Sequence, residues 1–176
     1  MKKICATLGT LAWMLSGCSS ITTEDYAGTT PKLDIQHYLN GQLEAKGILY
    51  DMHGKADTQF HVALHGKWNG GHGVLEEHFV YSDGRKEERT WTIDFTDEHH
   101  FTASAHDIVG EAKGSQNGNT VNMQYILDAR RPSGDTITLS MDDWMYLLDE
   151  KTLINRTSMH KYGLKVGELV ITFTKL

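Results

Sequence analysis

Apolar and polar residues alternate with a period of two over most of this 176-residue chain, and this alternation constrains the fold more than any other feature. The clearest stretch is Asp57 to Trp68, where Phe60, Val62 and Leu64 share one face. Successive side chains of a β-strand point to opposite faces of a sheet, so the pattern gives one apolar and one polar face. The alternation therefore predicts half-buried strands and argues against amphipathic helices.

The alternation recurs in roughly nine stretches, separated by turn signals such as Ser82-Asp83-Gly84 and Asn117-Gly118-Asn119. The expected strands cover residues 43–52, 57–68, 73–81, 89–95, 101–105 and 121–127, and then parts of 137–147, 154–156 and 169–173. A half-apolar meander of this length either stacks as two sheets or closes on itself, and closure leaves no edge to aggregate. We therefore predict an all-β fold, a single antiparallel meander barrel, with short helical stretches near 34–39 and 145–151.

The first 18 residues carry the three parts of a bacterial lipoprotein signal in the expected order. Met1-Lys2-Lys3 is basic, and residues 4–15 are mostly apolar but too few to span a bilayer. Leu15-Ser16-Gly17-Cys18 resembles the lipobox, in which the cysteine takes the lipid. We expect residues 1–17 to be a signal peptide and Cys18 to be lipidated. The alternative is an ordinary secretory leader with a cysteine nearby.

The residues after the cysteine indicate where the anchor places the domain. By resemblance to bacterial sorting signals, Ser19 in place of aspartate favours the outer membrane. Residues 18–31 are largely polar and end at Pro31, so we expect a lipidated cysteine with a flexible tether, followed by one barrel domain over 32–176. The expected location is the cell envelope, on a lipid anchor of the outer membrane that faces the periplasm.

Charge and cysteine content exclude several classes of protein. The formal net charge is −6, and loss of Lys2 and Lys3 with the leader makes it −8, which argues against a nucleic-acid partner. Cys5 is lost with the leader and Cys18 is expected to be acylated, so no thiol remains for a disulfide, a nucleophile or a zinc site. The domain must therefore be stabilised by its own core.

Five motifs of the mature chain carry a family resemblance. They are Phe79–Gly84, Asp107–Ala112, Asp142–Leu147, Ile154–Arg156 and Lys161–Glu168. Together they resemble a family of small bacterial outer-membrane lipoproteins of unknown function, over most of the chain from about Tyr26 onward. The resemblance implies a lipocalin-like barrel. It also implies an acyl chain as the ligand, since members are encoded near fatty-acid-modifying enzymes, but it defines no activity.

The ten histidines raise the question of a metal site, but their spacing argues against one. His61 and His65 are four residues apart, which on a strand is about 13 Å. Catalytic signals are equally weak, because no Gly-x-Ser-x-Gly motif is present. Paired carboxylates are split between the two faces of a strand: Asp142-Asp143 and Glu76-Glu77. We expect no metal, no cofactor and no enzyme, while an acid–base pair from distant segments stays open.

Asp143 is the most informative polar residue, because a continuous strand places it in the apolar row of Met141 and Met145. A carboxylate in such a row is costly unless it is paired, and Arg156 on the next strand is the nearest expected partner. Three interpretations stay open. Arg156 recognises a ligand carboxylate while Asp143 orients it, or the pair is a structural ion pair, or a bulge at Asp142-Asp143 turns both acids outward.

Aromatic residues on the apolar faces are the other candidates for ligand contact. Phe79, Trp91 and Tyr125 are expected to line a cavity, although Trp91, like Trp68, also suits a filled core. Trp144 and Tyr146 lie on the face opposite Asp143, where solvent, lipid or a partner would contact them. Asp107 and Glu111 surround the turn at Val109-Gly110, either as residues of the barrel mouth or as ordinary turn residues.

Three functions are compatible with these features. The favoured one is a membrane-anchored periplasmic lipoprotein that binds an apolar ligand or acyl chain, such as a fatty acid, inside the barrel. The second is a structural or interaction protein of the envelope with a filled barrel. The third is a hydrolase or isomerase that uses Asp107 and Glu111 or Asp143 and Arg156. A large apolar cavity would favour binding, and a filled interior would favour the scaffold.

Overall fold

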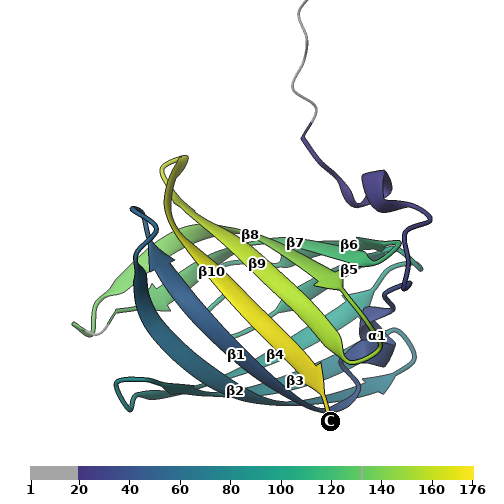
Figure 1. The fold of residues 1–176 in the computed structure, drawn as a ribbon, viewed down its shortest axis with the longest axis horizontal. Helices are drawn as coiled ribbons and strands as arrows, with labels where there is room; N and C mark the ends of the chain where they lie inside the picture. Colours follow the sequence, from purple (N-terminus) through teal and green to yellow (C-terminus); the bar gives the residue numbers. More distant parts are fainter. Residues whose placement is uncertain (1–19, 132) are drawn as a thin grey trace, which may run out of the picture.

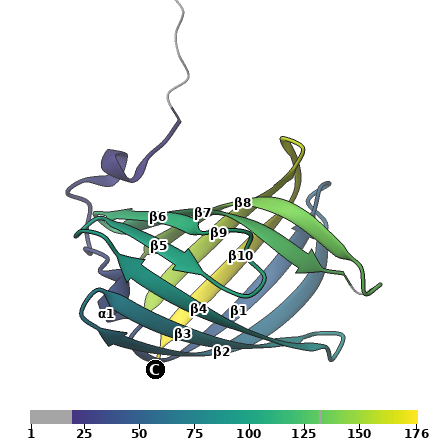
Figure 2. The same cartoon turned by 180° about the vertical axis from the view of Figure 1, so that it is seen from behind.

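The computed structural model describes residues 20–131 and 133–176, so Cys18 and the expected signal peptide lie outside the described residues. Within these ranges ten strands form a closed antiparallel barrel (Figures 1 and 2). They are β1 (Gly41–Asp51), β2 (Ala56–Asn69), β3 (His72–Tyr81), β4 (Lys86–Phe95), β5 (His100–Ser104), β6 (Ala112–Asn117), β7 (Thr120–Arg130), β8 (Thr136–Leu147), β9 (Thr152–Lys161) and β10 (Leu164–Lys175). Each strand pairs with its neighbours in sequence, and β1 pairs with β10 to close the ring. The predicted all-β meander barrel is confirmed, with ten strands in place of nine.

The period-two alternation determines which side chains fill the barrel. On β2, Phe60, Val62 and Leu64 are at most 5% exposed, whereas the residues between them face outward. The same rule applies around the barrel and produces a large apolar core that includes Trp91 and Phe173, with a second, smaller cluster of Leu127, Leu139 and Met141. Burial of these faces provides the main stabilisation of the barrel.

The strand that the alternation did not predict is β6. Its inward positions are Ala112, Gly114 and Gln116, so no row of large apolar residues marks it. The Phe101 ring of β5 covers Gly114, and a Cβ at that glycine would lie 2.0 Å from the ring.

The short helix expected near residues 145–151 is not formed. Met145 to Leu147 complete β8, and residues 148–151 form a turn.

A short helix closes one end of the barrel (Figure 1). Asp34 caps α1 (Ile35–Tyr38), because its carboxylate accepts hydrogen bonds from the backbone N–H groups of Gln36 and His37. Gly66 allows the helix to approach the wall, since a Cβ there would lie 1.8 Å from the carbonyl oxygen of Leu39. The helix expected near 34–39 thus serves as a plug. Ile35 and Tyr38 of the helix are buried, as are the flanking residues Leu33 and Leu39.

Residues 20–34 cross the outer surface of the barrel before they reach α1. They include a 3₁₀ helix, η1 (Thr23–Tyr26), which contacts β6 and β7. The Thr23 hydroxyl donates to Ser115 Oγ at 3.0 Å, and the Tyr26 ring lies 6.0 Å from Trp144 and 5.7 Å from Tyr146. The expected flexible tether is therefore wrong for residues 22–30. These residues dock on the barrel because they satisfy polar groups of β6 and cover the outward aromatic pair.

The opposite end of the barrel is not covered by α1, and its inward-facing residues are only half-buried. They include Phe79, Tyr81, Ile137, Met159, Val166 and Leu169. The part of the chain that the structure describes thus forms a barrel plugged by α1 at one end and more open at the other. Across the same ranges, none of the helices has the length and apolar character needed to traverse a bilayer.

Candidate functional site

A cavity of about 100 Å³ lies inside the barrel. Ile35 and Leu39 line it on the plugged side, and Phe79 and Leu169 line it towards the open end. Its wall is mostly apolar but also contains polar side chains at mid-height. We define the interior polar cluster as these side chains with their direct partner Asp107: Glu77, Arg89, Asp107, Tyr125, Asp143, Asn155 and Thr157.

Arg89 is the central cation of the interior polar cluster. Its Nε lies 3.1 and 3.0 Å from the two carboxylate oxygens of Asp107, and its Nη2 lies 2.7 Å from Oδ2. Glu77 stands directly across from Arg89 in the β3–β4 register, with 3.7 Å between Arg89 Nη1 and Glu77 Oε2. The guanidinium charge is therefore matched mainly by Asp107, because only that carboxylate accepts hydrogen bonds from it.

Glu77 is 8% exposed, and its Oε2 atom has no hydrogen-bond partner within the described residues. Burial raises the pKa of Glu77 to about 7, although the nearby Arg89 charge opposes the shift. An unpartnered buried carboxyl group is costly to the folded protein. Glu77 is therefore a group that a ligand can satisfy.

Asp143 is the second buried acid and is 6% exposed. One of its oxygens accepts hydrogen bonds from the Asn155 amide and, at 3.0 Å, from the Thr157 hydroxyl. The other oxygen has a 3.5 Å contact with the Tyr125 hydroxyl. Burial raises the pKa of Asp143 to about 6 despite these bonds, and burial also raises the pKa of Tyr125.

Aromatic rings surround the interior polar cluster. Trp91 and Tyr125 pack edge to face with their centroids 5.6 Å apart, and the Arg89 guanidinium lies 5.6 and 5.7 Å from the rings of Phe79 and Trp91. The structure thus brings four of the five predicted ligand-contact residues to one cavity: Phe79, Trp91, Tyr125 and Asp143.

Arg156, the fifth, lies on the outside of the barrel, and its predicted pairing with Asp143 is wrong. Asp143 stands opposite Thr157 in the β8–β9 register. Arg156 precedes Thr157 on β9 and therefore points to the other face of the sheet. Arg156 is 61% exposed and binds both carboxylate oxygens of Glu168 at 3.0 Å. The bulge interpretation is also wrong, because only Asp142 points outward, where it accepts a hydrogen bond from Asn122.

Sequence reasoning missed Glu77 and Arg89 as site residues, although the signal was present. Arg89 is two residues before Trp91 and Glu77 is two residues after Leu75, so the alternation assigns both to apolar faces. Asp107 belongs to the site through Arg89, whereas Glu111 is exposed. The pairs suggested for an enzyme, Asp107 with Glu111 and Asp143 with Arg156, are therefore not brought together.

The polar groups that line the cavity are hydrogen-bonding groups of several kinds. Among the described residues that line it, the polar groups are carboxyl, guanidinium, phenol, amide, indole and hydroxyl groups, without a histidine, cysteine, serine or lysine. A nucleophile paired with a general base is thus not evident in this cavity. Hydrogen bonding to a bound molecule is what the arrangement offers.

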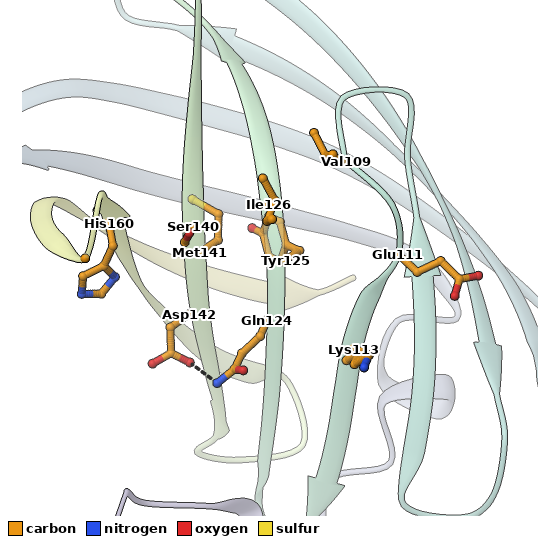
Figure 3. Close-up of a pocket in the computed structure, with 11 residues that line it drawn as sticks. Val109, Glu111, Lys113, Gln124, Tyr125, Ile126, Ser140, Met141, Asp142 and His160 are labelled. Atoms are coloured by element: carbon orange, nitrogen blue, oxygen red, sulfur yellow. Dashed lines mark hydrogen bonds between the residues drawn. The ribbon is translucent and has the colours of Figure 1, made fainter.

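A larger hollow of about 430 Å³ lies on the outer surface (Figure 3). Figure 3 shows Gln124 and Asp142 joined by a 3.4 Å hydrogen bond, with Val109 and Glu111 at one side and His160 at the other. Most of its polar residues are exposed, Glu111, Lys113, Gln124 and Ser140 among them, in contrast to the buried Glu77. We therefore place the candidate site inside the barrel, even though the outer hollow is larger.

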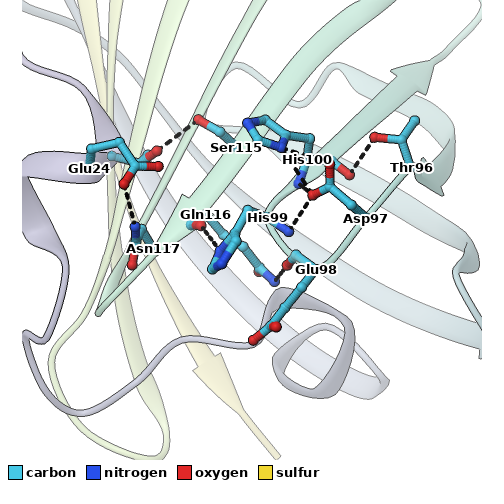
Figure 4. A network of polar contacts seen from close by, with 10 residues as sticks. Glu24, Thr96, Asp97, Glu98, His99, His100, Ser115, Gln116 and Asn117 are labelled. Carbon is cyan, nitrogen blue, oxygen red and sulfur yellow. Dashed lines mark hydrogen bonds and ion pairs between the residues drawn. The ribbon is translucent and has the colours of Figure 1, made fainter.

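The adjacent His99 and His100 bind the β4–β5 turn and β6 (Figure 4). The Nδ1 atom of His99 lies 3.0 Å from the carbonyl oxygen of Gln116, and His100 Nδ1 lies 3.0 Å from the Asp97 carboxylate. Between residues 20 and 176, apart from residue 132, no three His, Cys, Asp or Glu side chains come together in an arrangement that suits a metal ion.

The fold and the cavity together define the class: a lipocalin-like antiparallel barrel with polar groups in an apolar interior. The chain belongs to the family described as a protein of unknown function, DUF3833, whose profile matches residues 12–175. No curated protein matches the chain.

Two solved structures resemble the barrel. One is the S-type phycobiliprotein lyase CPES of Guillardia theta, with a TM-score of 0.57 and 6% identity over 79% of this chain and 88% of that chain. The other is Rv2717c of M. tuberculosis, with a TM-score of 0.56 and 12% identity over 84% and 99% of the two chains. At these identities the likeness concerns the fold alone.

Proposed function

We propose that the protein binds a small amphiphilic molecule inside its barrel and acts without catalysis. The observation that carries this proposal is the buried carboxyl of Glu77 beside a mostly apolar cavity, whose Oε2 atom faces Arg89 at 3.7 Å but accepts no hydrogen bond from the described residues. A core that served stability alone would be at least as stable with apolar residues in place of the interior polar cluster. A ligand with an apolar body and a polar group would satisfy both parts of the cavity.

The size of the cavity favours a slender ligand or a rearrangement of the mouth. About 100 Å³ is below the roughly 300 Å³ at which typical ligand pockets begin. The half-buried residues at the open end, such as Phe79 and Leu169, are those whose movement would enlarge it. The same small volume favours a second candidate, a filled barrel that serves as a scaffold in the envelope.

The proposed function includes an anchor. We propose that Cys18 carries lipid, as the lipobox-like sequence before it predicts, and that the barrel is held at the outer membrane on the periplasmic side. A fixed binding protein of this kind would take up an amphiphile that is poorly soluble in water.

Native mass spectrometry of the gently extracted full-length chain tests the binding proposal. We expect a non-covalent added mass on the wild-type protein. Leu169→Trp should abolish it by filling the cavity from a half-buried position, while Thr172→Trp, on the outer face of the same strand, should retain it. Circular dichroism would establish that both variants fold. A wild-type protein without added mass, and without affinity for any added amphiphile, would favour the filled scaffold.

A further inference from the structure

We propose, on the basis of the proposed function, that the polar group of the ligand is a hydrogen-bond donor, an amine or a hydroxyl, which Glu77 receives. Fatty acids, whose head is a carboxylate, are then the poorer ligands. This assignment goes beyond a general affinity for amphiphiles, because it states which headgroup chemistry enters the barrel.

The excess of acidic groups in the interior polar cluster disfavours an anionic headgroup. It contains three carboxyl groups, those of Glu77, Asp107 and Asp143, but one guanidinium, that of Arg89. An anionic headgroup would therefore enter a site in which acids outnumber the base, with little water to screen the repulsion.

Arg89 already directs two of its three guanidinium nitrogens at Asp107, and the third faces Glu77. Its Nε and Nη2 atoms already donate to Asp107 at 2.7 to 3.1 Å, in a fork-like geometry that suits one carboxylate. A ligand carboxylate that took this fork would displace Asp107 and leave it unpaired in a partly buried position, and one that approached Nη1 would meet the Glu77 carboxyl, 3.7 Å from that nitrogen. Displacement of Asp107 would replace the Arg89–Asp107 ion pair by one between Arg89 and the ligand, and the Asp107 carboxylate would be left without a compensating charge.

The hydrogen-bonding groups of the site that remain available to a ligand are acceptors. Glu77 is one of the residues that line the cavity, and its Oε2 atom has no hydrogen-bond partner among the described residues. Asp143 Oδ2 has only the long 3.5 Å contact with Tyr125. An ammonium or hydroxyl group would donate to these oxygens, and an ammonium would also reduce the excess of negative charge.

The proposal predicts a pH dependence that differs between headgroups. The charged or titratable groups that face Glu77 are Arg89 on β4, Asp107 in the loop before β6, Tyr125 on β7 and Asp143 on β8. With its pKa near 7, Glu77 is largely protonated at pH 6 and ionised at pH 8. An amine should therefore bind more tightly as the pH rises through about 7, whereas an alcohol should bind almost equally at both values.

Calorimetric titration with octylamine, octanol and octanoate tests the inference. These ligands share one chain and remain monomeric at low concentration. We would use the full chain with Cys18→Ser, so that no attached acyl chain competes. At about pH 8 we expect octylamine to bind at least about tenfold more tightly than octanoate, with octanol between them. Glu77→Gln should weaken octylamine binding about tenfold.

Glu76→Gln is the matched control, because Glu76 neighbours Glu77 in sequence but faces outward beside His65. It should bind all three ligands as the parent chain does. Tighter binding of octanoate, or octylamine binding unchanged by Glu77→Gln, would overturn the headgroup assignment and leave amphiphile binding intact. Failure of all three ligands to bind would overturn both proposals.

Discussion

Glu77 couples the stability of the barrel to pH. Its pKa is about 7 in the folded protein and near 4.5 when the side chain is exposed, so folding favours the protonated carboxyl. The folded state is therefore not penalised by Glu77 below about pH 4.5, and the penalty grows as the pH rises to about 7. Asp143, with a pKa of about 6, acts in the same direction over a lower range.

Glu77→Gln should remove the contribution of that residue, because the amide stays neutral at every pH. Relative to wild type, we expect the variant to gain stability between about pH 4.5 and 7 and to retain that gain above pH 7. The full gain should be on the order of 3 kcal/mol in the free energy of unfolding. Urea denaturation at several pH values measures it, with Glu76→Gln as control. Wild-type and Glu77→Gln curves that run parallel would show that Glu77 does not titrate in this range.

The residue-level result explains why the site was only partly predictable. Period two within one strand placed Asp143 inside correctly, because alternation requires no knowledge of other strands. Pairing it with Arg156 required the register across the turn at residues 148–151, and an error of one residue moves a side chain to the opposite face. The contact between Asp107 and Arg89 was even harder to predict from the sequence. Asp107 lies in a loop, where no alternation of apolar and polar residues indicates which way a side chain points.

At the level of elements, β6 shows the limit of the hydrophobic pattern. A strand of Ala112, Gly114 and Gln116 has no apolar row, and it is specified by its partners: the Phe101 ring fills the space above the glycine. The other nine strands and α1 were visible, because their own sequences carry alternation or a capping residue. The role of α1 as a plug depends on Gly66, far along the chain, and no local pattern predicts it.

Gly114→Ala should destabilise the barrel by about 1–3 kcal/mol, because the new methyl group would overlap the Phe101 ring. Phe101→Leu should remove most of that penalty by opening the space, although it costs some burial itself. Thermal or urea unfolding of the two single variants and the double variant forms a thermodynamic cycle. Strictly additive effects would mean that the ring and the glycine are not in contact.

At the scale of the whole molecule, the prediction concerns the proposed lipid anchor at Cys18. Cys18→Ser should remove the proposed acylation site, so the protein should shift from the membrane fraction to the soluble periplasmic fraction or accumulate as precursor. Cell fractionation with mass spectrometry of the N-terminus measures both outcomes. Cys5→Ser, a change within the proposed signal peptide, is the control and should leave the mature protein in the membrane. A processed Cys18→Ser protein that remained with membranes would contradict the anchor.

The pairing of β1 with β10 gives the chain a distinctive order of assembly. Leu43 aligns with Leu64 on one side but with Lys175 on the other, so the barrel joins residues from near the two ends of the chain. Every other strand can pair with its predecessor as the chain lengthens, yet the ring stays an open sheet until its last dozen residues arrive. A nascent or truncated chain therefore exposes two unpaired edges, at which intermolecular pairing begins. Pairing of β10 with both β9 and β1 is therefore expected to protect the domain against aggregation through its strand edges.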